Sequence, residues 1–242
     1  AFEGADALRK VTLVDQAPLG RTSRGNAATY TKAWDVVRAL YAKEPAATAR
    51  GLGPADFSFN VDGGRCEACA GEGYETVEMQ FLADVRLICP SCKGRRFKDE
   101  ILAVQRGGVS IADVLELTVD RALDVFRKEP AIVRALGPLA YLGLGYLRLG
   151  QPLTTLSGGE AQRLKLSRAL GESHEGALVV LDEPSAGLHA DEVEKLIHAL
   201  DRLVEAGGSV IVVEHDLDVV LAADHVIDMG PGAGASGGVV VA

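Results

Sequence analysis

Two stretches of the sequence carry residues that could bind and cleave a phosphate chain. The first is Ser157-Gly158-Gly159-Glu160, which stands immediately before the expected helix of residues 161–170. Glycines leave the amides at a helix start open, and the positive end of the helix dipole favours an anion there. The first stretch therefore predicts a phosphate-binding helix end, with an ordinary loop before a helix as the alternative interpretation.

The second stretch is Asp182-Glu183, which follows the apolar run of residues 177–181. That run is typical of a buried strand, and α/β sheets bind their ligands at the carboxyl ends of such strands. One carboxylate at this edge can hold Mg²⁺, and the other can orient or deprotonate an attacking water. The order and spacing of the two stretches together favour a nucleotide-hydrolysing site.

All four cysteines of the chain fall in two Cys-x-x-Cys-x-Gly segments, with nineteen residues between Cys69 and Cys89. Two residues between thiolates let one turn direct both sulfurs to the same ion, and two such turns complete a tetrahedral site. A redox dithiol and two unrelated pairs of buried thiols are the alternatives. A catalytic zinc is disfavoured because no coordination position stays open. We predict a structural Zn²⁺ bound by Cys66, Cys69, Cys89 and Cys92.

The elements that must position these residues alternate between strands and helices, which predicts an α/β fold with a nucleotide-binding core. A segment between the cysteine pairs predicts a hairpin. Strand patterns cover residues 11–14, 177–181 and 209–213. Helical patterns cover residues 31–42, 110–117, 118–128, 131–144, 161–170 and 192–205. We divide the chain into the first part of the core, a zinc unit, a helical subdomain and the rest of the core, at residues 1–60, 61–98, 99–155 and 156–242.

Composition and charge limit the class of protein. No apolar run approaches the roughly 18 residues that a membrane-spanning helix needs. The formal net charge is −9, and residues 160–242 hold 5 Lys and Arg against 15 Asp and Glu. A nucleic-acid partner would therefore bind a local patch, for which a solvated basic turn is the alternative. The densest such patch is Lys93, Arg95, Arg96 and Lys98.

The two ends of the sequence and its cysteine usage suggest its setting. The chain has no starting Met and no leader, and it stops within a strand-like run. The cysteines leave none for a disulfide framework, which is typical of a reducing compartment. We therefore expect a piece of a longer cytoplasmic protein.

The two phosphate-related stretches resemble motifs of the ABC ATPase family. Residues 156–162 resemble its signature motif, and residues 179–183 resemble its Walker B strand. The resemblance implies that the nucleotide-binding core is of the ABC type. The resemblance implies that Asp182 binds Mg²⁺ and that Glu183 is the catalytic carboxylate. It further implies a Q-loop glutamine and a switch histidine, at Gln16 and His215. It also implies a group of residues that caps an ATP molecule held by an opposing module, namely Ser157, Gly158, Gly159 and Glu160.

The order of motifs narrows the resemblance to the UvrA family, the damage-sensing subunits of bacterial nucleotide excision repair. The cysteine unit lies between the Q-loop at residues 15–22 and the signature motif, as in the second ABC module of that family. The resemblance runs almost end to end. It implies ATP with Mg²⁺ and structural Zn²⁺ as cofactors. It implies damaged double-stranded DNA, a UvrB-type helicase, the other ABC module and a second copy of the protein as partners.

Two departures from the family pattern define the alternatives. The sequence lacks Gly-x-x-x-x-Gly-Lys-Ser/Thr, the Walker A loop that cradles the β- and γ-phosphates. We therefore expect the chain by itself to bind ATP weakly and to hydrolyse none. Residues 184–188 differ from the family's Pro-Thr-Thr-Gly-Leu, so a UvrA-like paralogue for drug self-resistance is one alternative. A zinc-dependent DNA- or protein-binding adapter without ATP hydrolysis is the other.

Overall fold

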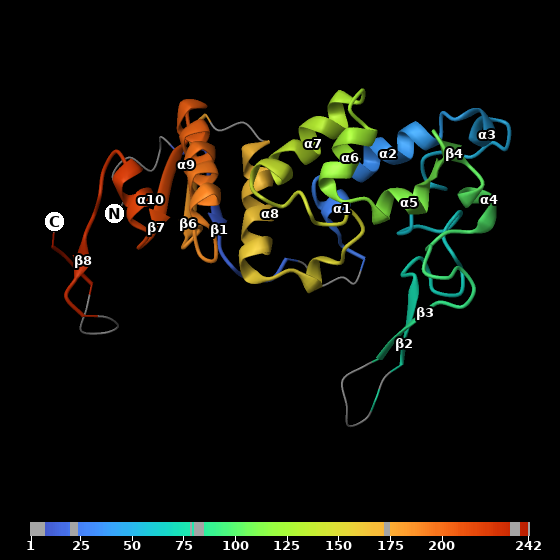
Figure 1. Ribbon diagram of the computed structural model, residues 1–242, viewed down its shortest axis with the longest axis horizontal. Helices are drawn as coiled ribbons and strands as arrows, with labels where there is room; N and C mark the ends of the chain where they lie inside the picture. The colour runs from blue at the N-terminus through green and yellow to red at the C-terminus, as the bar shows by residue number, and fades with distance from the viewer. Residues whose placement is uncertain are drawn as a thin grey trace. The chain divides into compact units, whose positions relative to one another are not determined.

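The computed structural model describes residues 8–19, 24–77, 79, 85–171, 175–232 and 238–241. Its elements are drawn in Figure 1. The chain divides into two compact units, which we call the sheet unit (Ala1–Gln16 and Glu172–Ala242) and the helical unit (Ala17–Gly171). The helical unit includes residues 17–60 and the signature helix, which the sequence analysis grouped with the nucleotide-binding core. The finer division into four segments stays a prediction. The expected Q-loop lies partly outside the described residues, at 20–22.

The sheet unit contains a three-stranded parallel sheet in the order β1-β6-β7, as the strand patterns predicted. The strands are β1 (Lys10–Val14), β6 (Ala177–Asp182) and β7 (Ser209–Val213). Val14 lies opposite Leu181 in the pairing of β1 with β6, and Asp182 lies opposite Val213 in the pairing of β6 with β7. Because all three strands are parallel, their carboxyl ends share one edge of the sheet.

Helix α9 (Ala190–Glu205) follows β6 and packs against β7 and the short α10 (Leu217–Ala222) (Figure 1). Its apolar stripe at helical spacing is buried and consists of Val193, Leu196, Ala199, Leu200 and Leu203. The alternate side chains Val11, Leu13, Ile211 and Val213 of the sheet are more than half exposed. One face of the sheet is thus covered within this unit, while the other presents apolar side chains. The unit ends in the two-residue antiparallel strands β8 (Met229–Gly230) and β9 (Val239–Val240).

The helical unit is built around a contiguous core that includes Trp34, Phe59 and Phe97, all at most 2% exposed. Helix α2 packs on α7, α6 on α7, and α7 on α8. The predicted helical segments are confirmed with shifted ends. The helices are α1 (Ala27–Tyr30), α2 (Ala33–Tyr41), α3 (Pro45–Thr48), α4 (Asp99–Leu102), α5 (Ile111–Glu116), α6 (Val119–Val125), α7 (Pro130–Tyr141) and α8 (Gly158–Leu170), with the 3₁₀ turn η2 (Leu153–Thr155) before α8.

The predicted hairpin between the cysteine pairs is also confirmed. Strands β2 (Tyr74–Val77) and β3 (Val85–Ile88) pair antiparallel, with Tyr74 opposite Ile88. The ribbon extends away from the helices of its unit (Figure 1). A second, two-residue ladder joins β4 (Gln105–Arg106) to β5 (Val109–Ser110). Within the described ranges, no helix has the length and apolarity needed to cross a membrane.

Candidate phosphate-binding and metal sites

Ser157 begins helix α8 in a reciprocal capping arrangement. The amide of Glu160 donates to the Ser157 hydroxyl at 3.3 Å, and the amide of Ser157 donates to a Glu160 carboxylate oxygen at 2.7 Å. A Ser followed three residues later by Glu favours this capping box, which fixes the first turn of the helix. Ser157 and Gly158 are exposed. The Ser157 hydroxyl also hydrogen-bonds to the Glu160 carboxylate, so its proton is used within the same turn.

Tyr146 braces this helix start from a neighbouring loop, a contact that the sequence analysis missed. Its hydroxyl donates to Glu160 at 2.5 Å. Burial raises the pKa of Glu160, but hydrogen bonds from Tyr146 and Ser157 outweigh it and leave the pKa below the usual range. The loop is held at Gly145, whose carbonyl accepts from the Asp120 amide at 3.0 Å. The Glu160 carboxylate at the start of α8 is therefore ionised and is held by hydrogen bonds from two residues, Tyr146 and Ser157.

Glu183 lies directly beyond β6 in a backbone conformation that non-glycine residues rarely adopt. Its φ is 45°, and its amide donates to the Val213 carbonyl at 2.8 Å. A residue held in this region costs of order 1–3 kcal/mol, and such residues cluster at functional sites. The Glu183 side chain is exposed, as is that of Asp182.

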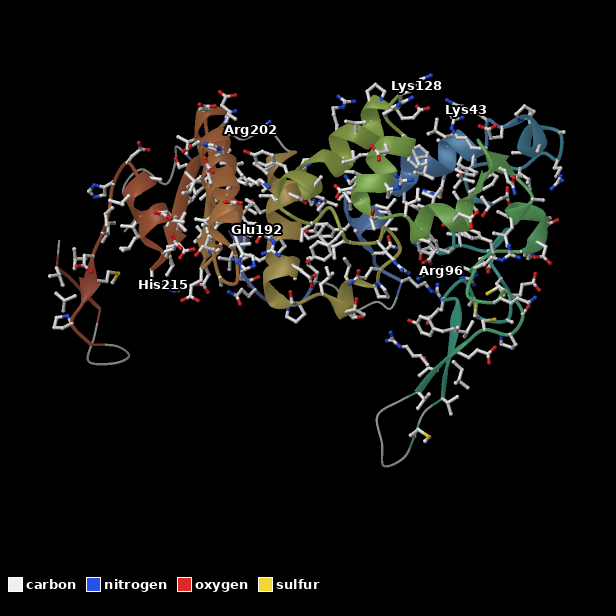
Figure 2. The ribbon with its side chains drawn as sticks, viewed as in Figure 1. Lys43, Arg96, Lys128, Glu192, Arg202 and His215 are labelled. Atoms are coloured by element: carbon white, nitrogen blue, oxygen red, sulfur yellow. The ribbon has the colours of Figure 1, made fainter. Side chains whose placement is uncertain are left out.

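His215 approaches Glu183 from the loop that follows β7. Its Nδ1 lies 3.7 Å from the nearer Glu183 oxygen, which makes an ion pair when the imidazole is protonated. Figure 2 shows His215 at an end of the sheet unit. Gln16 is exposed two residues beyond the end of β1, at the sheet edge to which the parallel register also brings Asp182. The structure thus gathers the four predicted residues of this unit at one edge of the sheet.

The four cysteines form one buried cluster. Their sulfur atoms all lie within 4.8 Å of one another, and the sulfurs of Cys69 and Cys92 are 3.7 Å apart. Four thiolates at the usual Zn–S distance of about 2.3 Å on a tetrahedron would be about 3.8 Å apart. The amide of Gly73 donates to the Cys69 sulfur at 3.2 Å, which is the kind of outer contact that orients a metal ligand. The arrangement fits a closed, structural zinc site.

The thiols of this cluster differ in acidity. Burial raises the pKa of Cys66, but hydrogen bonds, chiefly from Cys69, outweigh it and lower the pKa to about 7. Burial raises the pKa of Cys92 to about 12. Binding of Zn²⁺ therefore has to displace protons from this cluster, because the thiolate is the ligand.

The two cysteine turns repeat one backbone conformation. In each, the last two residues of Cys-x-x-Cys-x-Gly have positive φ, at 49° and 84° for Ala70 and Gly71 and at 52° and 84° for Lys93 and Gly94. The backbone amide of Lys93 donates to the Cys89 carbonyl at 2.8 Å, and the amide of Gly71 donates to the Cys66 carbonyl at 3.2 Å. Glycine adopts a positive φ at no steric cost, which suits its place at the end of each segment.

The basic cluster after the second turn is largely engaged within the protein. Lys98 pairs with Glu67 at 2.6 Å, and Arg95 pairs with Asp99 at 3.4 Å. Three of its four charges thus have internal partners, the third being that of Arg96, and both the solvated turn and the DNA-binding patch stay predictions.

Arg96, labelled in Figure 2, links the cysteine turns to Gly150 in the segment before the signature motif. Its guanidinium donates to the Gly150 carbonyl at 3.2 Å and lies 5.4 Å from the centre of the Phe59 ring. Its carbonyl accepts from the Cys66 amide at 2.8 Å, and its own amide bonds to Cys92. Burial lowers the pKa of Arg96 from its ordinary value.

Known proteins with a similar sequence or structure were found for this chain. No protein-family model matches the chain. UvrABC system protein A of Thermus thermophilus is 55% identical over 243 residues, which cover 100% of this chain and 26% of that protein. The Bacillus subtilis protein of the same name is 50% identical, with 100% and 25% covered. The crystal structure of UvrA2 from Deinococcus radiodurans matches with a TM-score of 0.92 at 54% identity, over 99% of this chain and 29% of that one. Over its whole length the chain is similar to UvrA proteins.

The chain spans about a quarter of the length of the curated relatives it matches. The predicted family resemblance and the mixed α/β fold are confirmed over the whole sequence. The predicted site residues fall into three groups. Gln16, Asp182, Glu183 and His215 belong to the sheet unit, whereas Ser157–Glu160 and the cysteine cluster belong to the helical unit.

Proposed function

We propose that this chain is part of a UvrA-type ATPase that recognises damaged DNA in nucleotide excision repair and loads a UvrB-type helicase. The observation that carries the proposal is the paired arrangement of Glu183 and His215 beside Asp182 at one sheet edge, in a chain similar to UvrABC system protein A along its full length. Phosphoryl transfer needs placement and charge stabilisation from the protein more than covalent chemistry. Exposed acids and an imidazole at a strand edge suit that task.

Each residue of the sheet unit then has a distinct role. Mg²⁺ bound with ATP would neutralise charge that develops on the phosphates, and Asp182 would hold the ion. Glu183 accepts a proton from the attacking water or orients it, and its fixed backbone keeps the carboxylate at the edge. His215 donates a hydrogen bond to the γ-phosphate. Gln16 orients the water from the end of β1.

The start of α8 would act on a different nucleotide, one held by an opposing ABC module. The Ser157 hydroxyl would turn from Glu160 to donate to the phosphates, and the amides of Gly158 and Gly159 would face them at the positive end of the helix. The Glu160 carboxylate accepts hydrogen bonds from Ser157 and Tyr146, so its negative charge is used by these capping contacts. ATP would thus draw two modules together.

The remaining parts serve DNA coupling in this proposal. A structural Zn²⁺ on the four cysteines would stiffen the base of the β2-β3 ribbon. Arg96 would transmit the position of that base to the residues before the signature motif. We further propose that the intact protein works as a dimer on double-stranded DNA. The present chain, which lacks a Walker A sequence, should hydrolyse no ATP by itself.

The test is the substitution Glu183→Gln in a full-length UvrA-type protein that carries this segment. The amide keeps the size of the side chain but accepts no proton, so the rate of ATP hydrolysis should fall by roughly 100-fold or more while ATP binding stays intact. Glu194→Gln on the exposed face of α9 is the matched control and should hydrolyse ATP at the wild-type rate. Wild-type turnover by E183Q would refute the role of Glu183 as the catalytic carboxylate.

A further inference from the structure

Glu214 stands one residue beyond β7 and accepts backbone hydrogen bonds from two separate loops. One carboxylate oxygen accepts from the Ser185 amide at 2.7 Å. The other accepts from the amides of His215 and Asp216, at 3.0 and 3.3 Å. The Glu214 side chain thus ties residues 29 positions apart in the sequence.

The two loops joined in this way are the ones that carry Glu183 and His215. Ser185 lies two residues after Glu183, within a turn closed by the bond from the Ala186 amide to the Glu183 carbonyl at 3.1 Å. The backbone of Glu183 is itself tied to β7 through Val213. The 3.7 Å approach of His215 to Glu183 therefore depends on two cross-links, one from strand to strand and one through Glu214.

The chemistry of the Glu214 carboxylate suits this task. Burial raises its pKa, but hydrogen bonds from Ser185, His215 and Asp216 outweigh it, so the pKa lies below the usual range. An ionised carboxylate only accepts, and here both oxygens are used by amides. Glutamine supplies a single acceptor oxygen, and its NH₂ group would face a donor on one side. The geometry therefore asks specifically for a carboxylate.

We propose that Glu214 is a positioning residue for ATP hydrolysis, holding the turn after Glu183 and the loop of His215 in the arrangement that hydrolysis requires. The inference rests on the proposed function, because it assumes that Glu183 and His215 act on ATP. Glu214 itself contacts no substrate, since its acceptor positions are filled by the protein. Its loss should therefore lower the rate of the chemical step and spare the binding of ATP.

The kinetic test compares Glu214→Gln and Glu214→Ala in the full-length UvrA-type protein, with E183Q and the control E194Q beside them. A misplacement of about 1 Å can cost about 100-fold in rate. We expect kcat to fall about tenfold in E214Q and about 100-fold in E214A, with KM for ATP within about twofold of the wild-type value. Partial rescue by Gln follows from the one acceptor that it retains.

The structural test uses the 242-residue chain itself and needs no activity. Hydrogen exchange at the amides of Ser185, His215 and Asp216 should become faster in E214A, while exchange in the middle of α9 stays unchanged. Slow exchange as in the wild type would overturn the inference, as would a wild-type kcat for E214A. Loss of ATP binding in both Glu214 variants would assign the residue to general stability and also contradict the proposal. Wild-type turnover by E183Q would reject the proposed function instead.

Discussion

The two cysteine turns provide a matched pair of glycine substitutions that tests the zinc unit. Gly71 and Gly94 occupy the same place in Cys-x-x-Cys-x-Gly and have the same φ of 84°. A Cβ added at Gly71 would lie 2.1 Å from the carbonyl oxygen of Phe59, whereas one added at Gly94 would lie no closer than 3.7 Å to Ile88. The two substitutions to Ala thus share the energetic cost of a positive φ and differ in the steric cost of the added Cβ.

The shared cost is the left-handed backbone, which disfavours Ala by about 1–2 kcal/mol. Gly71→Ala adds a clash with backbone that only a shift of about 1 Å relieves, and such overpacking costs typically 1–3 kcal/mol or more. G71A should therefore be less stable than G94A by about 1–3 kcal/mol. Because binding of structural zinc is coupled to folding of its site, the difference should appear as roughly 5- to 150-fold weaker zinc affinity.

The assay is zinc competition with a coloured chelator, on reduced protein at fixed pH. Wild-type protein should hold about one zinc per chain, as a Cys₄ site requires. G94A should lose zinc at moderately lower chelator concentration, and G71A at much lower concentration. Equal zinc affinities of the two variants, or a weaker one for G94A, would refute the reasoning that the packing of Gly71 on Phe59 fixes the first turn.

Other consequences concern the contacts around α8 and the core. Arg96→Ala removes the bond to Gly150 but no zinc ligand, so the purified variant should keep its zinc while thermal unfolding of the helical unit shifts to lower temperature. Tyr146→Phe deletes the donor to Glu160, and faster hydrogen exchange in the first turn of α8 should report it. The lowered pKa of Glu160 contributes to the free energy of unfolding above the unfolded-state pKa, and this contribution is lost as pH falls through the folded-state pKa. In Y146F the contribution is smaller, so the free energy of unfolding should fall less below about pH 4.3 than in the wild type, as measured by denaturant titration at several pH values. Leu136→Ala empties a fully buried position in α7 and should lower the free energy of unfolding by about 2–5 kcal/mol, measured by denaturant titration.

Local patterns in the sequence were enough to predict the central sheet, the hairpin and the longer helices, and to indicate the candidate ligand residues. Three patterns each predict a local geometry from a few neighbouring residues. They are the β-branched run of β6, the Ser-Gly-Gly-Glu start of α8 and the repeated Cys-x-x-Cys-x-Gly. Such features are visible without the fold, because the residues that interact are neighbours along the chain.

The contacts that hold these groups in place were invisible for the opposite reason. Glu214 meets Ser185, and Arg96 meets Gly150, across 29 and 54 positions with no motif that marks either pair. The sequence indicated a candidate DNA-binding patch at the basic cluster because sequence alone does not reveal that Glu67 pairs with Lys98. The strained backbone of Glu183 likewise depends on its bond to Val213 in the next strand of the sheet.

The central claim, that Asp182, Glu183 and His215 form the hydrolytic edge of an ATP site, is tested most directly by the nucleotide that the protein retains. Full-length UvrA-type protein carrying this segment, as wild type and as E183Q, would be incubated with ATP and Mg²⁺, separated from free nucleotide and analysed by chromatography. The account predicts ADP on the wild-type protein and intact ATP on E183Q. ADP on both proteins in equal amount would contradict it.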